Sequence, residues 1–342
     1  MLRKLKASLP IFLELIGDKP VDEILQNDVN VFFDNAQKLP ARRFDEKFKG
    51  KSLKQIISLN KGDCISEKTF TGTYVATVSV FLEWAKVHYS DQGFKPLSVK
   101  GGLYRGTRSK GINKQRAIKP DELKILFGHE IMKGYVDDPK TAHYCWLPLI
   151  GLYTGARINE VCQLNPFTDI VQDADTGIWY FHFTDEGETA FGVDKSIKTK
   201  SSIRVVPIHS KLIELGFLDY VKKVGAGGHK IIFPKWAVRN GKASANSTKW
   251  FSRYLIDSGL KDETKGAKLI GFHAFRHTFI TYASKNKIEG IQAITGHEEG
   301  DKKSSVFRGY ITKDLTDGLT DKQVMIEKFD FGLELYKPNS KF

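Results

Sequence analysis

One stretch of the chain carries only positive charge, and it limits how the rest can fold. From Gln92 to Pro120 there is no acidic residue, and glycines interrupt the stretch. Its basic residues are Lys95, Lys100, Arg105, Arg108, Lys110, Lys114, Arg116 and Lys119. A flexible, purely positive segment is typical of a linker that lies along phosphates, with a solvated loop as the alternative. We therefore expect a first domain at residues 1–91, a linker at 92–117 and a second domain at 118–342.

The composition agrees with two domains and a polyanionic partner. The chain has 342 residues, 41% of them apolar, which is enough for two cores, and a formal net charge of +13. Such a charge favours binding to nucleic acid but says little about fold. Cys64, Cys145 and Cys162 lack metal-ligand spacing and cannot all pair with one another, which indicates a reducing cytoplasm. No stretch approaches the ~20 apolar residues of a membrane span.

The first domain is predicted to be helical. Apolar residues recur at helical spacing from Leu9 to Ile16, and shorter helices are expected at Val21–Ile24 and Val29–Phe33. Ser66 opens a longer segment that ends near Lys86. The threonines of this segment either face a DNA groove or only cap and solubilise the helix.

The second domain is predicted to be mostly helical with a small sheet. A helix opens at Lys119-Pro120 with acidic residues in its first turn, and the apolar run Tyr144–Leu152 predicts a buried helix. The expected strands are Ile178–Phe183, Ile203–Ile208 and Ile231–Phe233. From Ser247 onward helices dominate again.

Polar residues suited to chemistry at a phosphodiester follow one another through this second domain. They are Arg157, Lys198, His273, Arg276, His297 and Tyr310. Arginines can hold non-bridging oxygens, a lysine can protonate a leaving oxygen, histidines can move or anchor protons, and a tyrosine can attack. His273 and Arg276 are three residues apart and share one helix face. Glu160 is three residues after Arg157 and can orient it, although an ordinary surface ion pair has the same spacing.

Together these motifs resemble the tyrosine recombinase (phage integrase) family. The matching segments are Tyr153–Glu160 (YTGARINE), Lys198 before Arg204-Val205-Val206-Pro207, His273–Phe279 (HAFRHTF), Thr295-Gly296-His297, and Tyr310. The resemblance implies an all-α core-binding domain of the SAM-like type. It also implies a catalytic domain that is mostly α-helical with a small antiparallel sheet.

The resemblance also implies a mechanism. Tyr310 would attack the scissile phosphorus and leave a 3′-phosphotyrosine and a free 5′-hydroxyl, with neither ATP nor a metal. Arg157 and Arg276 would bind the equatorial oxygens and His297 would donate to one of them. Lys198 would protonate the leaving oxygen and His273 would accept the tyrosine proton. Glu160 would support Arg157.

The implied partner is double-stranded DNA at attachment or core sites. We expect a monomer in free solution, a homotetramer on paired sites, accessory DNA-bending or directionality factors, and action on the nucleoid in a bacterial cytoplasm. The implied function is integration or excision of a phage or genomic island. The basic residues expected to contact DNA are Lys100, Arg105, Arg108, Lys110, Lys114, Arg116 and Lys200.

Three departures from the family pattern leave alternatives open. Thr295 stands where leucine is more common, and Lys200 competes with Lys198 for the lysine role. The chain starts in what resembles the middle of the usual N-terminal region, so either the chain is truncated or this member lacks an arm-site-binding domain. The apolar tail from about residue 314 either packs on its own domain or is exchanged with a neighbouring protomer. A type IB topoisomerase and a non-catalytic DNA-binding regulator are the alternative functions.

Overall fold

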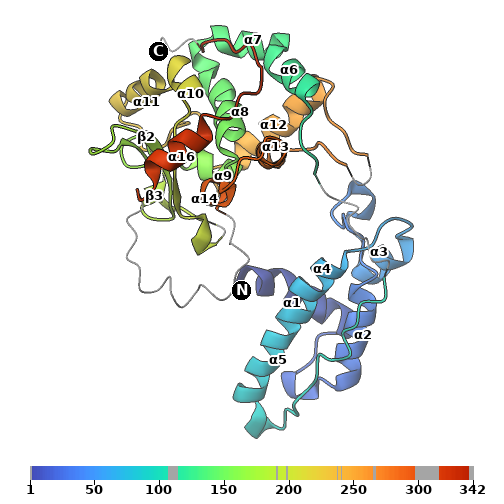
Figure 1. Cartoon of the computed structure of the whole chain (residues 1–342). Helices are drawn as coiled ribbons and strands as arrows, with labels where there is room; N and C mark the ends of the chain where they lie inside the picture. Colours follow the sequence, from blue (N-terminus) through green and yellow to red (C-terminus); the bar gives the residue numbers. More distant parts are fainter. Residues whose placement is uncertain are drawn as a thin grey trace. The chain divides into compact units, whose positions relative to one another are not determined.

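The computed structural model describes residues 2–106, 115–189, 192–197, 199–236, 238–239, 241–264, 267–296 and 316–338. The chain divides into two compact units, Met1–Lys110 and Gly111–Phe342, whose elements are labelled in Figure 1. No helix in the described part is long and apolar enough to cross a bilayer.

Unit 1 is helical, as predicted. Its helices are α1 (Leu2–Ile16), α2 (Gln26–Ala36), α3 (Leu53–Leu59), α4 (Glu67–Thr69) and α5 (Ala76–His88), with a π-helical turn at Phe70–Val75 and 3-10 turns at Val21–Glu23, Glu46–Phe48 and Ser90–Gln92. Ser66 begins the long segment, because its Oγ accepts a hydrogen bond from Thr69 N at 3.2 Å. The core is aromatic: the Phe12 and Phe32 ring centroids lie 4.9 Å apart. Buried side chains from α1, α2 and α5 pack together, so unit 1 has a hydrophobic core of its own.

The first part of the predicted linker packs on unit 1. Phe94 is buried in the core of this unit, and Leu97, Val99 and Tyr104 pack against the same core. Tyr104 Oη donates to Ile65 O at 2.7 Å. Apolar side chains therefore dock this stretch while its charged neighbours stay outside, so the unit boundary lies near the end of the basic stretch rather than at residue 91. Residues 107–114, with Arg108, Lys110 and Lys114, lie outside the described residues.

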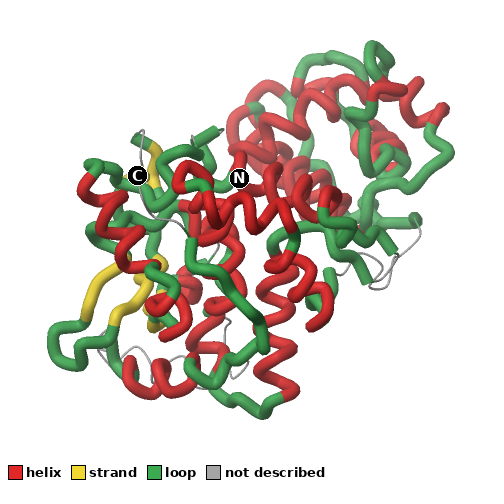
Figure 2. Tube along the Cα trace, turned by 90° about the horizontal axis from the view of Figure 1, so that it is seen from above, coloured by secondary structure: helices red, strands yellow, loops and turns green. Residues whose placement is uncertain are grey.

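Unit 2 contains the predicted mixture of helices and a small antiparallel sheet. Its helices are α6 (Pro120–Gly128), α7 (Glu130–Asp137), α8 (Ala142–Thr154), α9 (Ile158–Cys162), α10 (Ser210–Glu214), α11 (Phe217–Ala226), α12 (Ala245–Asp257), α13 (His273–Lys285), α14 (Ile291–Thr295) and α16 (Leu319–Ile326), with 3-10 turns at Pro139–Thr141 and Lys200–Ser202. Strands β1 (Ile170–Gln172), β2 (Trp179–Phe183) and β5 (Arg204–Pro207) form an antiparallel sheet in the order β1-β2-β5. A separate hairpin pairs β3 (Glu188–Thr189) with β4 (Val193–Asp194). Figure 2 shows the strands gathered at one side of this unit, with helices around them.

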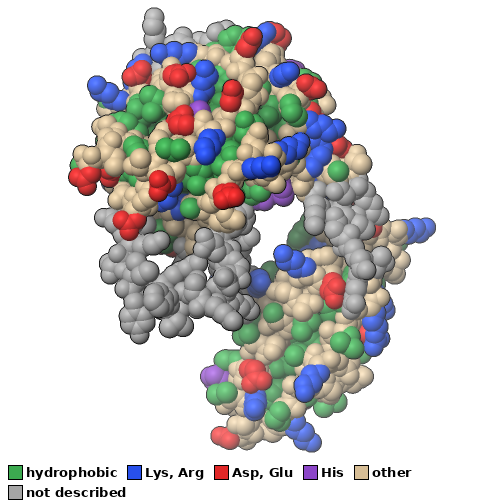
Figure 3. All heavy atoms as spheres, viewed as in Figure 1, with side chains coloured by type: hydrophobic (Ala, Val, Ile, Leu, Met, Phe, Trp, Pro, Cys, Tyr) green, Lys and Arg blue, Asp and Glu red, His purple; other side chains and the backbone are tan. Residues whose placement is uncertain are grey.

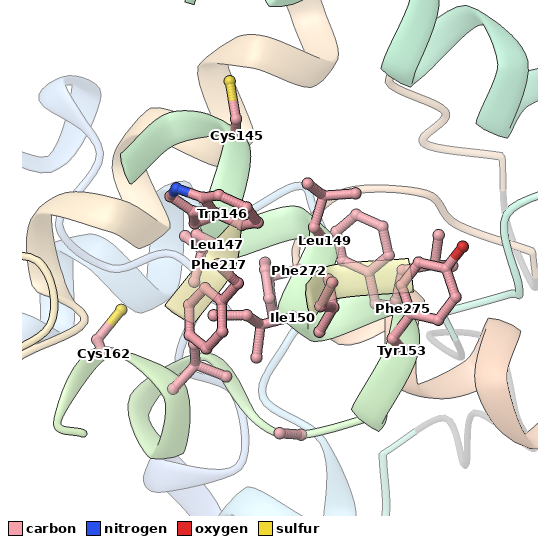
Figure 4. Packing of buried hydrophobic residues seen from close by; sticks show 14 of the residues in the cluster. Cys145, Trp146, Leu147, Leu149, Ile150, Tyr153, Cys162, Phe217, Phe272 and Phe275 are labelled. Atoms are coloured by element: carbon pink, nitrogen blue, oxygen red, sulfur yellow. The ribbon is translucent and has the colours of Figure 1, made fainter. Parts of the chain in front are cut away.

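Helix α8 is the centre of unit 2. Every residue of α8 except Tyr144 is buried, which confirms the predicted buried helix. Trp146 and Ile150 point into the aromatic core that Figure 4 shows, where Phe272 approaches from the chain entering α13. A Cβ at Gly151 would lie 2.3 Å from the Phe272 ring, so the close approach of α13 to α8 requires glycine there. The candidate site residues at the end of α8 and the start of α13 are thereby fixed to one core.

The C-terminal segment packs on its own unit. In α16, Leu319 and Ile326 are buried, and the helix lies beside β5 and α14 (Figure 1). Phe329 then stacks on Phe279 of α13, with centroids 3.9 Å apart and planes at 4°. The extended chain continues to α7, where Leu335 helps to line a small cavity. The described residues 316–338 therefore pack against unit 2 of the same chain.

One strand prediction was wrong, and the short strands β1, β3 and β4 were not predicted. Ile231–Phe233 is buried but forms no strand, because no described strand pairs with it. Its backbone bonds are Ile232 N to Leu164 O at 2.8 Å and Trp236 N to Phe233 O at 3.0 Å, and Pro234 ends the segment. The short strand β1 was not predicted, although it supplies one edge of the sheet.

Candidate active site

Arg157 lies at the sharp turn between α8 and α9. Gly155 ends α8 in the left-handed region, at φ 61°. Arg157 is the extended residue before α9, and its N–H donates to Glu160 Oε2 at 3.0 Å while Nη1 donates to Oε1 at 2.6 Å. The Arg157 side chain is 22% exposed and that of Glu160 is 3% exposed. The pair is therefore a largely buried contact that fixes Arg157, not a surface ion pair.

A second arginine shares the Glu160 carboxylate. Arg204, the first residue of β5, donates from Nη2 to Glu160 Oε2 at 2.9 Å and lies 4.5 Å above the Phe183 ring. Burial raises the pKa of Glu160, but Arg204 and the hydrogen bonds from both arginines outweigh burial and hold that pKa below its ordinary value. Sequence reasoning gave Arg204 no role. The available signal was a charged residue opening an apolar strand whose four positions are all buried.

Arg276 joins two turns of the site. It lies on α13, is 2% exposed, and donates from Nη1 to Gly155 O at 3.0 Å and from Nη2 to Thr295 O. Burial, together with the positive charges of Arg157 and Arg204, lowers the pKa of Arg276 to about 10, so the group stays charged at neutral pH. His273 lies one turn earlier on α13 and is exposed. Arg276 thereby connects the end of α8 to the end of α14.

The Thr295-Gly296 turn is in contact with the turn before β5. Gly296 ends α14 at φ 65°, and a Cβ there would lie 3.0 Å from Ser201 O and 3.1 Å from Ser202 Cα. Only glycine combines this conformation with so close an approach. His297 follows next in sequence, but His297 and Tyr310 lie outside the described residues.

The segment from Ser196 to Ser202, in whose sequence the two candidate lysines Lys198 and Lys200 stand, flanks Arg157. Ser202 Oγ accepts a hydrogen bond from Arg157 Nη1 at 3.1 Å, and Asn159 Nδ2 donates to Ser196 O at 3.4 Å. Both ends of this turn are therefore held by residues at the start of α9. Lys198 lies outside the described residues, and Lys200 opens the 3-10 turn Lys200–Ser202. Ser202 is a site residue that sequence reasoning missed.

The assembled site carries an excess of positive charge. Arg157, Arg204 and Arg276 surround one carboxylate, Glu160, and their mutual repulsion lowers the pKa of Arg276 and of Arg204, after the larger effect of burial. Among the described residues, hydrogen bonds to the Arg157 side chain use only Nη1, which leaves Nε and Nη2 for an incoming anion. The described part of the chain contains no cluster of His, Cys, Asp or Glu arranged to hold a metal.

The predicted DNA-contacting residues have different surroundings. Lys100 and Arg105 are exposed, and Arg105 lies 3.5 Å from Asp34. Arg116 is 18% exposed and donates to both Glu122 oxygens at 2.7 Å and to Asp262 at 3.2 Å. Arg116 therefore anchors the start of α6 inside unit 2, with its guanidinium engaged by two carboxylates. In the view of Figure 3, lysines and arginines are spread over the surfaces rather than gathered in one patch.

Several solved recombinase structures are similar to this chain. The Tn1549 transposon integrase in complex with a circular intermediate DNA is 16% identical, with 95% of this chain and 94% of that chain covered and a TM-score of 0.51. The XerH site-specific recombinase bound to its difH substrate is 17% identical over 86% of this chain and 72% of that one, with a TM-score of 0.44. A lambda integrase dimer bound to a COC′ core site is 16% identical over 92% and 73%, with a TM-score of 0.43. The first of these similarities shows the fold. A search of curated protein sequences finds no match.

The comparison with protein families gives the clearest result. The sequence model of the phage integrase family matches residues 119–313, which is more than half of the chain and spans the arginine cluster described above. The chain therefore belongs to the phage integrase family of site-specific tyrosine recombinases, enzymes that break and rejoin DNA.

Proposed function

We propose that this recombinase cleaves each strand with Tyr310 as the nucleophile. The Tyr310 oxygen forms a bond to the scissile phosphorus, the bond to the 5′-oxygen breaks, and a 3′-phosphotyrosine remains. His273 takes the tyrosine proton and Lys198 gives a proton to the departing oxygen. Attack by a 5′-hydroxyl reverses these steps, so the energy of the phosphodiester is conserved.

The excess of positive charge at the arginine cluster carries this proposal. In the transition state of phosphoryl transfer, negative charge builds up on the equatorial oxygens of the phosphate. Guanidinium groups that are already held in position stabilise this charge without having to reorient. Arg276 is held by Gly155 O and Thr295 O, and Arg157 by Glu160 and Ser202, so both forks are oriented before DNA arrives. Fixed donors of this kind contribute about 10²–10³ each in rate. His297 would donate to one of the same oxygens.

The proposed substrate is double-stranded DNA with attachment or core sites, at which the protein integrates or excises a phage or genomic island. The formal charge of +13 and the exposed Lys100 and Arg105 support binding to phosphates. We infer a monomer in free solution and a homotetramer on paired sites, acting on the bacterial nucleoid with accessory DNA-bending or directionality factors. The related structures are described as DNA complexes of dimers and tetramers.

Trapping of the covalent intermediate tests the proposal. The protein is incubated with supercoiled DNA, denatured with SDS and analysed for protein attached to a 3′ end. The unaltered chain should give an adduct, while Tyr310→Phe should bind DNA equally well and give none. Tyr282→Phe is the control, because Tyr282 packs against Phe329 and Phe331 in unit 2. An adduct from Tyr310→Phe would assign the attack to another tyrosine, and retarded DNA without any adduct would indicate a regulator.

A further inference from the structure

Arg204 contacts three of the segments that carry the site, although it occupies no position of the attacking or phosphate-binding set. Its Nη2 donates to Glu160 Oε2 at 2.9 Å, its Nη1 to Ser202 O at 2.8 Å, and its Nε to Ile294 O at 2.6 Å. These acceptors, at positions 160, 202 and 294, lie far apart in the sequence. One planar group therefore fixes the distances between three distant pieces of sequence.

Each acceptor contacts a candidate catalytic residue or lies within four residues of one in the sequence. Glu160 holds Arg157 through two hydrogen bonds. Ser202 closes the turn that contains Lys198, and its hydroxyl also contacts Arg157 at 3.1 Å. Ile294 lies on α14, three residues before His297 in sequence.

All three nitrogens of Arg204 donate hydrogen bonds to acceptors of the protein itself. Its side chain is 5% exposed, and the guanidinium lies against the Phe183 ring at 4.5 Å. Stacking on an aromatic face and use of all three nitrogens match the geometry of arginine, and a lysine ammonium cannot reproduce this fork. The contacts of Arg204 are thus directed at the protein framework rather than at a ligand.

We propose that Arg204 is a positioning residue of the recombination reaction. It fixes the positions of Glu160, the turn at Ser202 and the end of α14 relative to one another, so that the catalytic residues on these segments meet at one phosphate. This inference rests on the proposed function, because it assumes that Arg157 acts at the scissile phosphate. Misplacement of reacting groups by about 1 Å costs about 10²-fold in rate, which sets the expected size of the effect.

The test measures the single-turnover rate of adduct formation. The substrate is a nicked duplex that carries the DNA sequence recovered from the covalent adduct of the unaltered protein. Arg204→Lys and Arg204→Met should both slow adduct formation about 100-fold, with DNA affinity unchanged in a gel-shift assay. Because Arg204→Met leaves Glu160 with one partner fewer, Glu160→Gln combined with Arg204→Met removes both buried charges and should fold while remaining slow.

A double-mutant cycle with Arg157→Ala separates positioning from a merely structural role. If Arg204 acts through Arg157, the combined loss should be smaller than the product of the two single losses. Tyr220→Phe is the control for stability, because it removes a buried hydrogen bond to Ile232 O at 2.9 Å away from the site. This variant should lower the melting temperature and leave the cleavage rate unchanged.

Three results would overturn the inference. Full activity of Arg204→Lys would mean that charge alone suffices. If the fold-loss in rate of the double variant with Arg157→Ala equals the product of the two single fold-losses, the two arginines act independently. An equal loss of rate in Tyr220→Phe would mean that reduced stability explains the effect. Failure of the proposed function is a separate outcome, since Arg157→Ala alone would then cleave at the normal rate or no adduct would form at all.

Discussion

Replacement of Phe329 by alanine tests whether the C-terminal segment belongs to its own domain. The Phe329 side chain is fully buried, stacks on Phe279 at 3.9 Å and lies 5.3 Å from the Tyr282 ring. Loss of a buried phenylalanine costs about 3–5 kcal/mol through lost apolar contact and the cavity left behind. For a domain of this size each kcal/mol lowers the melting temperature by about 2–4 °C, so Phe329→Ala should lower it by about 6–20 °C.

The measurement is urea and thermal unfolding of the DNA-free protein, followed by circular dichroism at two protein concentrations. Val324→Ala is the matched control, because Val324 lies on α16 but is 57% exposed. Its effect should stay within about 0.5 kcal/mol. The melting temperature of the unaltered chain should not depend on protein concentration, since the contact is made within one chain.

Two outcomes would refute this reasoning. If Phe329→Ala unfolds at the same urea concentration as Val324→Ala, the stacking on Phe279 contributes nothing to the isolated chain. If the melting temperature of the unaltered protein rises with concentration, the segment is stabilised by a neighbouring protomer. The second result would favour exchange of the tail between subunits.

Further variants address the turn, the lysine and the linker. Gly296→Ala should destabilise unit 2 by about 1–3 kcal/mol in urea unfolding, because alanine is strained in the left-handed region and its Cβ contacts the neighbouring turn. The control is Gly134→Ala in α7, where an added Cβ meets nothing within 4 Å. Lys198→Ala should cleave ordinary DNA slowly and recover on a 5′-bridging phosphorothioate, whose sulfur leaves without a proton, whereas Lys200→Ala should show no such recovery; the reverse pattern would exchange the two roles. A combined variant neutralises Arg105, Arg108 and Lys110. It should flatten the slope of log K against log salt by up to about 2.7, at about 0.9 for each phosphate contact, and an unchanged slope would mean that these cations are only solvated.

Local sequence signals predicted several of the elements of unit 2. The apolar run in Tyr144–Leu152 became α8, and the expected strands Ile178–Phe183 and Ile203–Ile208 became β2 and β5. Pro120 with acidic residues after it opened α6. Such signals reside within about ten neighbouring residues, where propensity and capping decide the structure. The run Ile231–Phe233 failed because burial without a hydrogen-bonding partner strand produces no ladder.

The candidate site was predicted only in part, for a physical reason. The spacing of Arg157 and Glu160, and of His273 and Arg276, is local and readable from a helix period. The role of Arg204 depends on which carboxylate it meets 44 residues away in sequence, and no local pattern contains that information. The docking of Phe94 on unit 1 was missed for the same reason, since charge and glycine content dominated the surrounding sequence. Contacts between residues that are far apart in the sequence therefore cannot be predicted from periodicity and are seen only in the folded structure.

Two of the three arginines of the site, Arg204 and Arg276, donate mainly to main-chain oxygens, which has a consequence for how this protein can diverge. Arg276 donates to Gly155 O and Thr295 O, and Arg204 to Ser202 O and Ile294 O. A carbonyl oxygen is present whatever side chain stands at that position, so substitutions at such positions preserve the acceptor as long as the backbone keeps its path. Thr295 can thus replace the more common leucine without loss of the hydrogen bond. Because these hydrogen bonds end on main-chain oxygens, many side chains can be substituted during evolution while a few guanidinium groups keep the geometry of the site. A fold shared with the Tn1549 integrase at 16% identity is what such tolerance would produce.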